Sequence, residues 1–200
     1  MSPRRYEMSA RAEATAETRK SIVEAAKELH AERGVQATSF EEIAERAGVS
    51  LATVYRHFPS LKELVPACAQ SVFDLIRPPT LEEASRKFAT IADPSERLAL
   101  LLRRTVHCYD LGEGWLHAAY RERDFIPELD AALRIIQDSL RVLIQAAVAR
   151  KLRKSDEAAL FVLCDFPFYK SLQSAGLERR AAERTLLELA LEVERKGRKS

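Results

Sequence analysis

The sequence predicts an all-α protein with about nine helices, because apolar residues recur at helical spacing along the whole chain. Strand-like alternation of apolar and polar residues is never sustained. Glycine and proline, which interrupt helices, number only 6 and 8 among 200 residues. Hydrophobic residues make up 46% of the chain and charged residues 31%, enough for one large or two small domains.

The first predicted elements are a polar arm and one helix. Residues 1–14 look like a flexible arm, whose arginines are either solvated or able to reach a phosphate or a minor groove: Arg4, Arg5 and Arg11. A helix follows from about Thr18 to Arg33, and Gly34 ends it. His30 falls on the apolar face of this helix. We therefore expect His30 to be packed and hydrogen-bonded rather than to bind a ligand.

Residues 39–58 predict two short helices joined by a tight turn. Ser39 and Glu42 can form a capping box, Gly48 can end the first helix in a left-handed conformation, and Ser50 can cap the second. Val54 and Phe58 share one face of the second helix and should point inward. The residues left on its outward face are Leu51, Ala52, Thr53, Tyr55, Arg56 and His57. Such a donor-rich face suits a helix that lies in the major groove of DNA.

The charge of this region is balanced, because residues 1–60 contain nine Lys or Arg residues and nine Glu residues. The whole chain carries a net charge of only +2. Binding to DNA would therefore depend on where the cations lie. Each neutralised phosphate contributes about −0.9 to the slope of log K against log salt, so few available cations predict a shallow salt dependence.

A connecting helix is expected from Leu61 to Ile76, capped by Ser60 with Glu63 and kinked by Pro66. Arg77-Pro78-Pro79 ends it and marks a boundary. The further helices are expected from Thr80, from Asp93 to a turn at Gly112-Glu113-Gly114, from Trp115 to Arg123, from Pro127 to about Arg150, from Asp156 to Ala175 with Ser155 as its cap, and from Glu178 to Glu194. We expect residues 15–60 to form one domain and residues 61–200 a second, helical domain.

The predicted helix over residues 156–175 is apolar on two sides. One stripe contains Leu160, Cys164, Phe168, Leu172 and Ala175, and the other contains Val162, Phe166 and Tyr169. In a chain of this size the second stripe needs a partner outside the subunit. A homodimer with two C-terminal helices from each subunit would supply it.

The helices after residue 100 carry an aromatic and semi-polar set with the composition of a ligand pocket. We call these residues the candidate ligand set: His107, Tyr109, Trp115, Phe161, Cys164, Asp165, Phe168 and Tyr169. Packing in the core or in the dimer is the alternative for each of them. Asp165 is the sharpest candidate, because an unpaired carboxylate on an apolar helix is costly. It must pair with an arginine of the protein or with a cationic or hydrogen-bonding effector.

The sequence gives no support for an enzyme, a metal site or a cofactor. The four histidines share no metal-binding spacing, and neither a nucleophile elbow nor a glycine-rich phosphate loop occurs. The three cysteines are widely separated and are expected to be free thiols. No apolar run approaches the roughly 18 residues of a membrane span, and the N-terminus lacks the apolar stretch of a secretion signal. We expect a cytoplasmic protein.

The stretch from Glu17 to Leu64 resembles the DNA-binding domain of the tetracycline-repressor (TetR) family of bacterial transcription regulators. Spacing and residue type agree at Gly34, Thr38-Ser39, Ile43-Ala44, Ala47-Gly48-Val49-Ser50 and Thr53-Val54-Tyr55, followed by His57 and Phe58. The resemblance covers about a quarter of the chain. The remainder is similar to the family only in its number of helices and in its expected dimerisation through C-terminal helices.

The resemblance implies that Thr53, Tyr55 and His57 contact phosphates or nearby bases, although packing is the alternative for Tyr55 and His57. The other candidate contacts are Thr38, Ser50, Leu51, Ala52, Arg56 and Lys62. Leu51 and Ala52 replace a basic or polar residue and a glycine, so that Leu51 could contact a thymine methyl group. Leu61 replaces a common lysine, with Lys62 one place later.

As a family member, the chain would bind a palindromic operator as a dimer, with two recognition helices about 34 Å apart, and a small molecule would release it. Two alternatives remain. One is a constitutive DNA-binding dimer without an effector, and the other is a helical dimer that has lost DNA binding.

Overall fold

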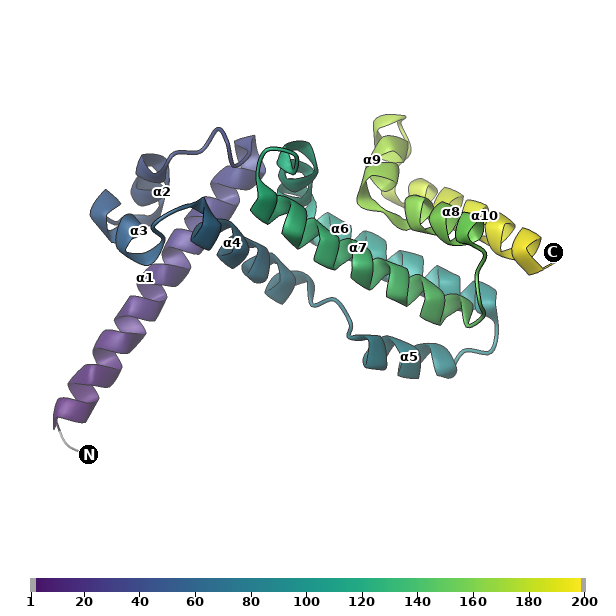
Figure 1. The fold of residues 1–200 in the computed structure, drawn as a ribbon, viewed down its shortest axis with the longest axis horizontal. Coiled ribbons are helices and arrows are strands. Elements are labelled where there is room, and N and C mark those ends of the chain that lie inside the picture. The colour runs from purple at the N-terminus through teal and green to yellow at the C-terminus, as the bar shows by residue number, and fades with distance from the viewer. Residues whose placement is uncertain (1–2, 199–200) are drawn as a thin grey trace. The chain divides into compact units, whose positions relative to one another are not determined.

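A computed structural model describes the backbone of residues 3–198 and the side chains of residues 10–197. The described residues form ten α-helices and contain no strand, which confirms the all-α class (Figure 1). The chain divides into two compact units. The first unit comprises Met1–Leu75 and Glu113–Ala132, and the second comprises Ile76–Gly112 and Leu133–Ser200.

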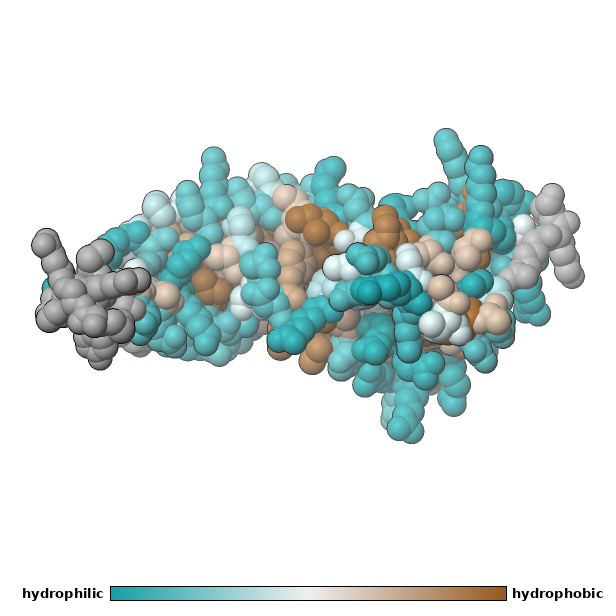
Figure 2. Space-filling model, turned by 90° about the horizontal axis from the view of Figure 1, so that it is seen from below, coloured by the Kyte–Doolittle hydropathy of each residue, from teal (hydrophilic) through white to brown (hydrophobic). Residues whose placement is uncertain are grey.

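None of the helices in the described part of the chain is long and apolar enough to cross a membrane. Hydrophilic side chains predominate on the face drawn in Figure 2, where the hydrophobic residues form small separate areas.

The helices α1 (Pro3–Arg33), α2 (Phe40–Ala47), α3 (Leu51–His57) and α4 (Leu61–Ile76) follow one another in the first part of the chain. The predicted signals between them are confirmed. Ser39 and Glu42 form the reciprocal capping box of α2, and Gly48 ends that helix with a φ of 67°. The Ser50 hydroxyl accepts the amide of Thr53 and caps α3.

The helix α1 begins at Pro3, so the backbone of residues 3–14 is helical where we expected an arm. Residues 1 and 2, and the side chains of Arg4 and Arg5, lie outside the described part of the chain. The segment from Tyr6 to Glu17 contains four alanines and neither glycine nor proline. Alanine has the highest helix propensity, and nothing interrupts the segment before the predicted start at Thr18. A polar segment without a breaker therefore extends the helix.

The helix α6 (Pro94–Glu122) runs through the turn predicted at Gly112-Glu113-Gly114, so the separate helix predicted from Trp115 to Arg123 is wrong. Its predicted start is confirmed, because the Asp93 carboxylate accepts the amide of Ser95 at 2.9 Å. Gly114 lies inside α6 and forms no turn there, and it allows close packing against α1. A Cβ atom at Gly114 would lie 2.7 Å from the Cβ of Ala31, so a larger residue would separate α6 from α1.

The helix predicted from Asp156 to Ala175 is in fact two helices, α8 (Lys154–Cys164) and α9 (Phe166–Ser174). Asp165 between them has an extended conformation, and its carboxylate accepts the amide of Phe166 at 3.0 Å. The reason for the break is Pro167. In a continuous helix it could not donate to the carbonyl of Leu163, and its ring would clash with that carbonyl. At the other end, Ser155 lies inside α8, whose cap residue is Arg153.

The remaining helices are α5 (Leu81–Ala89), α7 (Pro127–Val148) and α10 (Arg179–Arg198). Thr80 and Glu83 form the capping box predicted at the start of α5. The helix α10 continues beyond Glu194, where we expected it to end. In the second unit, α10 packs against α8 and α9 (Figure 1).

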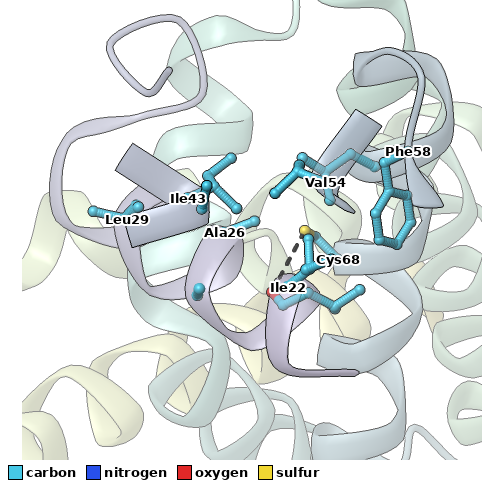
Figure 3. Packing of buried hydrophobic residues seen from close by; sticks show 11 residues of the cluster. Ile22, Ala26, Leu29, Ile43, Val54, Phe58 and Cys68 are labelled. Carbon is cyan, nitrogen blue, oxygen red and sulfur yellow. Dashed lines mark hydrogen bonds between the residues drawn. The ribbon is translucent and has the colours of Figure 1, made fainter. Parts of the chain in front are cut away.

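The core of the first unit is built from small and branched residues of four helices (Figure 3). Figure 3 labels seven residues of this core, which are Ile22, Ala26 and Leu29 of α1, Ile43 of α2, Val54 of α3, Phe58 after α3, and Cys68 of α4. Each of these side chains is at most 3% exposed. Burial raises the pKa of the Cys68 thiol to about 12. This core fixes α3 by its inward face and leaves the opposite face outside.

Candidate nucleic-acid interface

The helix α3 divides into a buried side and an exposed side as the sequence predicts. Val54 and Phe58 are fully buried, whereas Tyr55 is 48% exposed. Ser50, Ala52 and Arg56 are also exposed, and Leu51, Thr53 and His57 are half-buried. The exposed side therefore presents hydroxyl, guanidinium and imidazole groups from one short helix, a set of donors that can reach phosphates and base edges.

Tyr55 is held in place although half of its surface is exposed. Its ring packs against Phe40 with the ring centroids 5.1 Å apart and the planes tilted by 42°. Such a contact fixes the direction of the side chain at low entropic cost, because a tyrosine has only two rotatable bonds. The packing and DNA-contact roles considered for Tyr55 are thus compatible with each other.

The hydroxyl groups at the start of α3 lie close together. Ser50 and Thr53 have their hydroxyl oxygens 2.9 Å apart, and the Ser50 oxygen also accepts the amide of Thr53 at 3.2 Å. A phosphate at this end of α3 would meet amide groups of the first helical turn as well as these hydroxyls.

Thr38, which belongs to the predicted contact set, lies in the turn between α1 and α2. Its side chain is buried, and its hydroxyl donates to the carbonyl of Gly34 at 2.7 Å. This bond fixes the turn between α1 and α2. Thr38 therefore has a structural partner that the sequence pattern did not reveal.

Glutamates of the first unit form ion pairs with three cations of α1 and α2. Lys27 pairs with Glu24 at 2.5 Å and Arg33 pairs with Glu42 at 2.9 Å. Arg46 pairs with both Glu28 and Glu32, at 3.2 and 3.0 Å. Within the described part of the chain, Arg56 and Lys62 have no ion-pair partner. The balanced charge of residues 1–60 thus conceals an uneven placement.

Arg19 joins α1 to the end of α3. Its guanidinium lies 4.0 Å from the centre of the Phe58 ring and donates to the His57 carbonyl at 3.5 Å. Burial, together with the nearby cations Arg56 and Arg19, lowers the pKa of His57 below its ordinary value. A phosphate beside this imidazole would act in the opposite direction, since it favours the charged form.

The second unit brings together part of the candidate ligand set. Tyr109 and Tyr169 are buried with their ring centroids 6.2 Å apart. The Tyr109 hydroxyl donates to the carbonyl of Cys164 at 2.8 Å, and the Tyr169 hydroxyl donates to Asp110 at 2.8 Å. These polar groups are therefore satisfied by the protein itself.

Asp165 is buried, and its carboxylate accepts hydrogen bonds from a side-chain amide and from the start of α9. Gln137 donates to its carboxylate at 3.2 Å, and the amide of Phe166 does so at 3.0 Å. Since the carboxylate caps a helix, its position at the break between α8 and α9 has a sufficient structural reason.

The other members of the candidate ligand set are dispersed. His107 is exposed, and Trp115 belongs to the first unit. Phe161 is half-buried with the guanidinium of Arg141 3.7 Å from its ring centre. Phe168 is also half-buried. A shallow depression in the second unit is lined by Ser95, Glu188, Leu191 and Arg195, and it contains none of the predicted residues.

The candidate ligand set did not include three residues that contact the buried tyrosines or Asp165, namely Phe166, Asp110 and Gln137. Phe166 meets Tyr109 edge to face at 5.4 Å. Asp110 also pairs with Arg179 at 2.7 Å. Asp110 directly follows Tyr109, but nothing in its spacing distinguishes it from a solvated acid. Among the described residues, no group of three or more His, Cys, Asp or Glu side chains could hold a metal ion.

Part of the first unit matches a known protein family. Residues 22–68 match the family described as bacterial regulatory proteins, tetR family. The HTH-type transcriptional regulator TtgR of Pseudomonas putida is 43% identical over 58 residues, which make up 29% of this chain and 28% of that protein. The chain thus matches less than a third of the length of this curated relative.

Two solved structures share the fold of the chain at low sequence identity. A transcriptional regulator from Rhodococcus sp. Rha1 is 19% identical, with a TM-score of 0.69, over 89% of this chain and 96% of the other. The multidrug binding protein EbrR, complexed with imidazole, is 18% identical, with a TM-score of 0.63, over 88% of this chain and 89% of the other. The likeness in fold therefore extends far beyond the matched 47 residues from 22 to 68.

Proposed function

We propose that this chain, whose residues 22–68 match the tetR family of bacterial regulatory proteins, is a dimeric repressor of that family that binds a palindromic DNA operator. A small-molecule effector would release it from the operator. It would work in the cytoplasm and would have neither catalytic activity nor a cofactor. Thr53, Tyr55, Arg56, His57 and Lys62 would contact the DNA, and Leu51 would contribute to base preference.

The observation that carries this proposal is the exposed donor face of α3 on a closed core. Val54 and Phe58 anchor the helix, and Tyr55 is oriented by Phe40. The cations Arg56 and Lys62 form no ion pair in the described part of the chain. A helix that only filled space would not need to expose a tyrosine and an arginine next to each other. Half or more of protein–DNA hydrogen bonds go to phosphates and sugars, which donors of this kind supply.

The experiment that tests it is titration of the full chain with labelled duplexes that flank its own reading frame, followed by fluorescence anisotropy. Tyr55→Ala should weaken binding to the selected duplex by about thirtyfold, near 2 kcal/mol. Phe125→Ala is the matched control, because Phe125 is 73% exposed and lies outside α3. Unchanged affinity of the Tyr55 variant would place the DNA contact outside this face of α3. Failure of the wild-type chain to bind any duplex would favour a helical dimer that has lost DNA binding.

The dimer is proposed from the exposed apolar side chains of the C-terminal helices. Val162 of α8 is 52% exposed and Leu189 of α10 is 41% exposed, on two helices that pack together. The other members of the second stripe, Phe166 and Tyr169, are buried within the subunit. Val162→Glu with Leu189→Glu should shift sedimentation from dimer to monomer and abolish cooperative binding to a palindrome. A dimer that survives both changes would place the interface elsewhere.

A constitutive DNA-binding dimer without an effector is the second candidate function. The internal hydrogen bonds of Tyr109 and Tyr169 favour that second candidate, because satisfied polar groups gain little from a ligand. EbrR, which shares the fold, is a multidrug binding protein. Melting curves with a panel of planar and cationic compounds decide between the two. Stabilisation by a compound that also raises the operator Kd supports the effector, and no stabilisation by any compound supports the constitutive dimer.

A further inference from the structure

The buried carboxylate of Glu122, at the end of α6, holds the turn that separates α1 from α2. Glu122 is only 6% exposed. Its Oε2 accepts the amide of Val35 at 2.8 Å and the amide of Gln36 at 2.9 Å. These amides belong to residues 86 and 87 positions earlier in the chain. A side chain that belongs to neither α1 nor α2 therefore satisfies the backbone between them.

The turn is shaped to receive this carboxylate. Gly34 has a φ of 101°, which non-glycine residues rarely adopt. A Cβ atom at Gly34 would lie 1.9 Å from the Glu122 Oε1. The close approach of the carboxylate thus requires a glycine at this position. The same turn is closed by the Thr38 hydroxyl on the Gly34 carbonyl, two residues before α2 begins at Phe40.

Arg121 completes the arrangement on the solvent side. Its guanidinium donates to the Glu122 Oε1 at 2.7 Å and to the Arg33 carbonyl at 3.0 Å. Burial by itself would raise the pKa of Glu122, but the bonds from Arg121, Gln36 and Val35 bring the pKa below the ordinary value. The carboxylate is therefore ionised at neutral pH, when its bonds to the two amides are strongest.

The end of α6 is fitted to α1 at a second point, two helical turns before Glu122. Gly114 allows the close contact with Ala31 described above. The part of α6 from Gly114 to Glu122 is thereby docked along the last turn of α1 and the turn after it. Because α2 starts directly after that turn, the direction in which α2 and α3 leave α1 depends on this docking.

We propose that Glu122 is a positioning residue for DNA binding. It touches no DNA, and it sets the angle at which the helix-turn-helix is held on α1. The inference rests on the proposed function for its DNA readout, and it has a second readout that does not. Loss of the carboxylate should loosen the turn at Val35 and Gln36 first and should then weaken operator binding without removing any contact residue.

The test compares Glu122→Ala and Glu122→Gln in the full chain. The alanine variant loses both acceptors, whereas glutamine retains a carbonyl oxygen that can accept the amides of Val35 and Gln36 but is neutral. In Glu122→Ala, amide exchange at Val35 and Gln36 should accelerate by at least about tenfold, and the operator Kd should rise by about tenfold. Glu122→Gln should have an exchange rate and an operator Kd close to those of the wild type.

Leu129→Ala is the matched control for a loss of stability. Leu129 is fully buried in the same unit, in α7, and has no part in the turn. Measured well below the melting temperature, this variant should bind the operator as the wild type does. Equal operator affinities for Glu122→Ala and Leu129→Ala would overturn the proposal, as would unchanged exchange at Val35 and Gln36. If the wild type binds no DNA, the proposed function fails, and the exchange readout still decides whether Glu122 holds the turn.

Discussion

The donors of α3 in the first unit face outward from a closed apolar core, whereas Tyr109, Tyr169 and Asp165 of the second unit are buried beside polar partners of their own. The first arrangement leaves hydrogen-bonding capacity for a partner molecule. The second uses much of that capacity within the chain. The same residue types therefore indicate a binding surface in one unit and internal structure in the other, and the partners of each group decide which applies.

Replacement of Phe58 by alanine tests whether the first unit depends on its closed core, and it has the largest expected effect. Phe58 is fully buried and carries the guanidinium of Arg19 over its ring. Its loss should lower the free energy of unfolding by about 4 kcal/mol, from lost burial and the cavity left behind. Urea titration measures this. Phe125→Ala should change the free energy by less than about 0.5 kcal/mol, and similar values for the two variants would contradict the role of the core.

His30→Phe removes an imidazole that is buried in the first unit without a hydrogen-bond partner among the described residues. Neither ring nitrogen of His30 has a hydrogen-bond partner among the described residues, and burial lowers the pKa of His30 to about 4. We expected this histidine to be packed and hydrogen-bonded, and it is packed only. As pH falls below about 6.5, the unfolded chain takes up a proton that the folded chain does not accept until about pH 4, so stability is lost over this window.

Phenylalanine does not titrate, so His30→Phe should not show this loss of stability as the pH falls. Between pH 7.5 and pH 5 the wild type should lose about 2 kcal/mol more than His30→Phe. At pH 7.5 the variant should be more stable by about 1 kcal/mol, because the two unpaired nitrogens are gone. Urea titrations of both proteins at the two pH values measure the difference. Parallel pH profiles would mean that His30 is protonated at its ordinary pKa.

Tyr109→Phe and Tyr169→Phe test whether the buried groups of the second unit are structural. Each removes one hydroxyl from a hydrogen bond of 2.8 Å and should cost about 1 kcal/mol of stability. Operator affinity should not change. A contrary result would be a compound that stabilises the wild type but not Tyr169→Phe, although the variant without the compound is as stable as the wild type. The Tyr169 hydroxyl would then bind a ligand, and it would not be purely structural.

The salt dependence of operator binding tests the placement of cations on the first unit, and it has the smallest expected effect. Arg56→Ala and Lys62→Ala should each reduce the slope of log K against log salt by about 0.9 per subunit. Arg46→Ala should leave the slope unaltered, because Arg46 is already paired with Glu28 and Glu32. Anisotropy titrations between 50 and 300 mM salt, roughly, measure the slopes. A reduced slope for Arg46→Ala would place that residue on the DNA.

The helix boundaries from α2 to α4 could be predicted almost completely, because they depend on local signals. The capping box at Ser39, the left-handed Gly48 and the cap at Ser50 act within a few residues of one another, and each occurs where it was predicted. The start of α1 was missed because a charged, alanine-rich segment is compatible with both a helix and an arm. The inward and outward faces of α3 followed from spacing alone.

The second unit was less predictable, because its local signals have two meanings. Gly114 of the first unit misled in the same way, because glycine there predicts a turn, yet it permits a close contact of α6 with Ala31. Asp165 reads as a buried charge in need of a ligand, yet Pro167 makes it a helix cap. The hydrogen bonds of Tyr109 and Tyr169 join residues more than 50 positions apart, and spacing in the sequence does not encode such pairs. Which of these residues serve an effector remains a prediction.

The division of the chain has a practical consequence for protein engineering. The first unit is not a continuous segment, since it includes Glu113–Ala132 as well as Met1–Leu75. A hybrid regulator made by grafting residues 1–75 onto a foreign effector domain would leave behind Glu122 and Gly114. Its turn at Val35 would lack an acceptor, and its α1 would meet an unmatched helix. Exchange of DNA specificity between relatives should therefore transplant both segments together or restrict the changes to the outer face of α3.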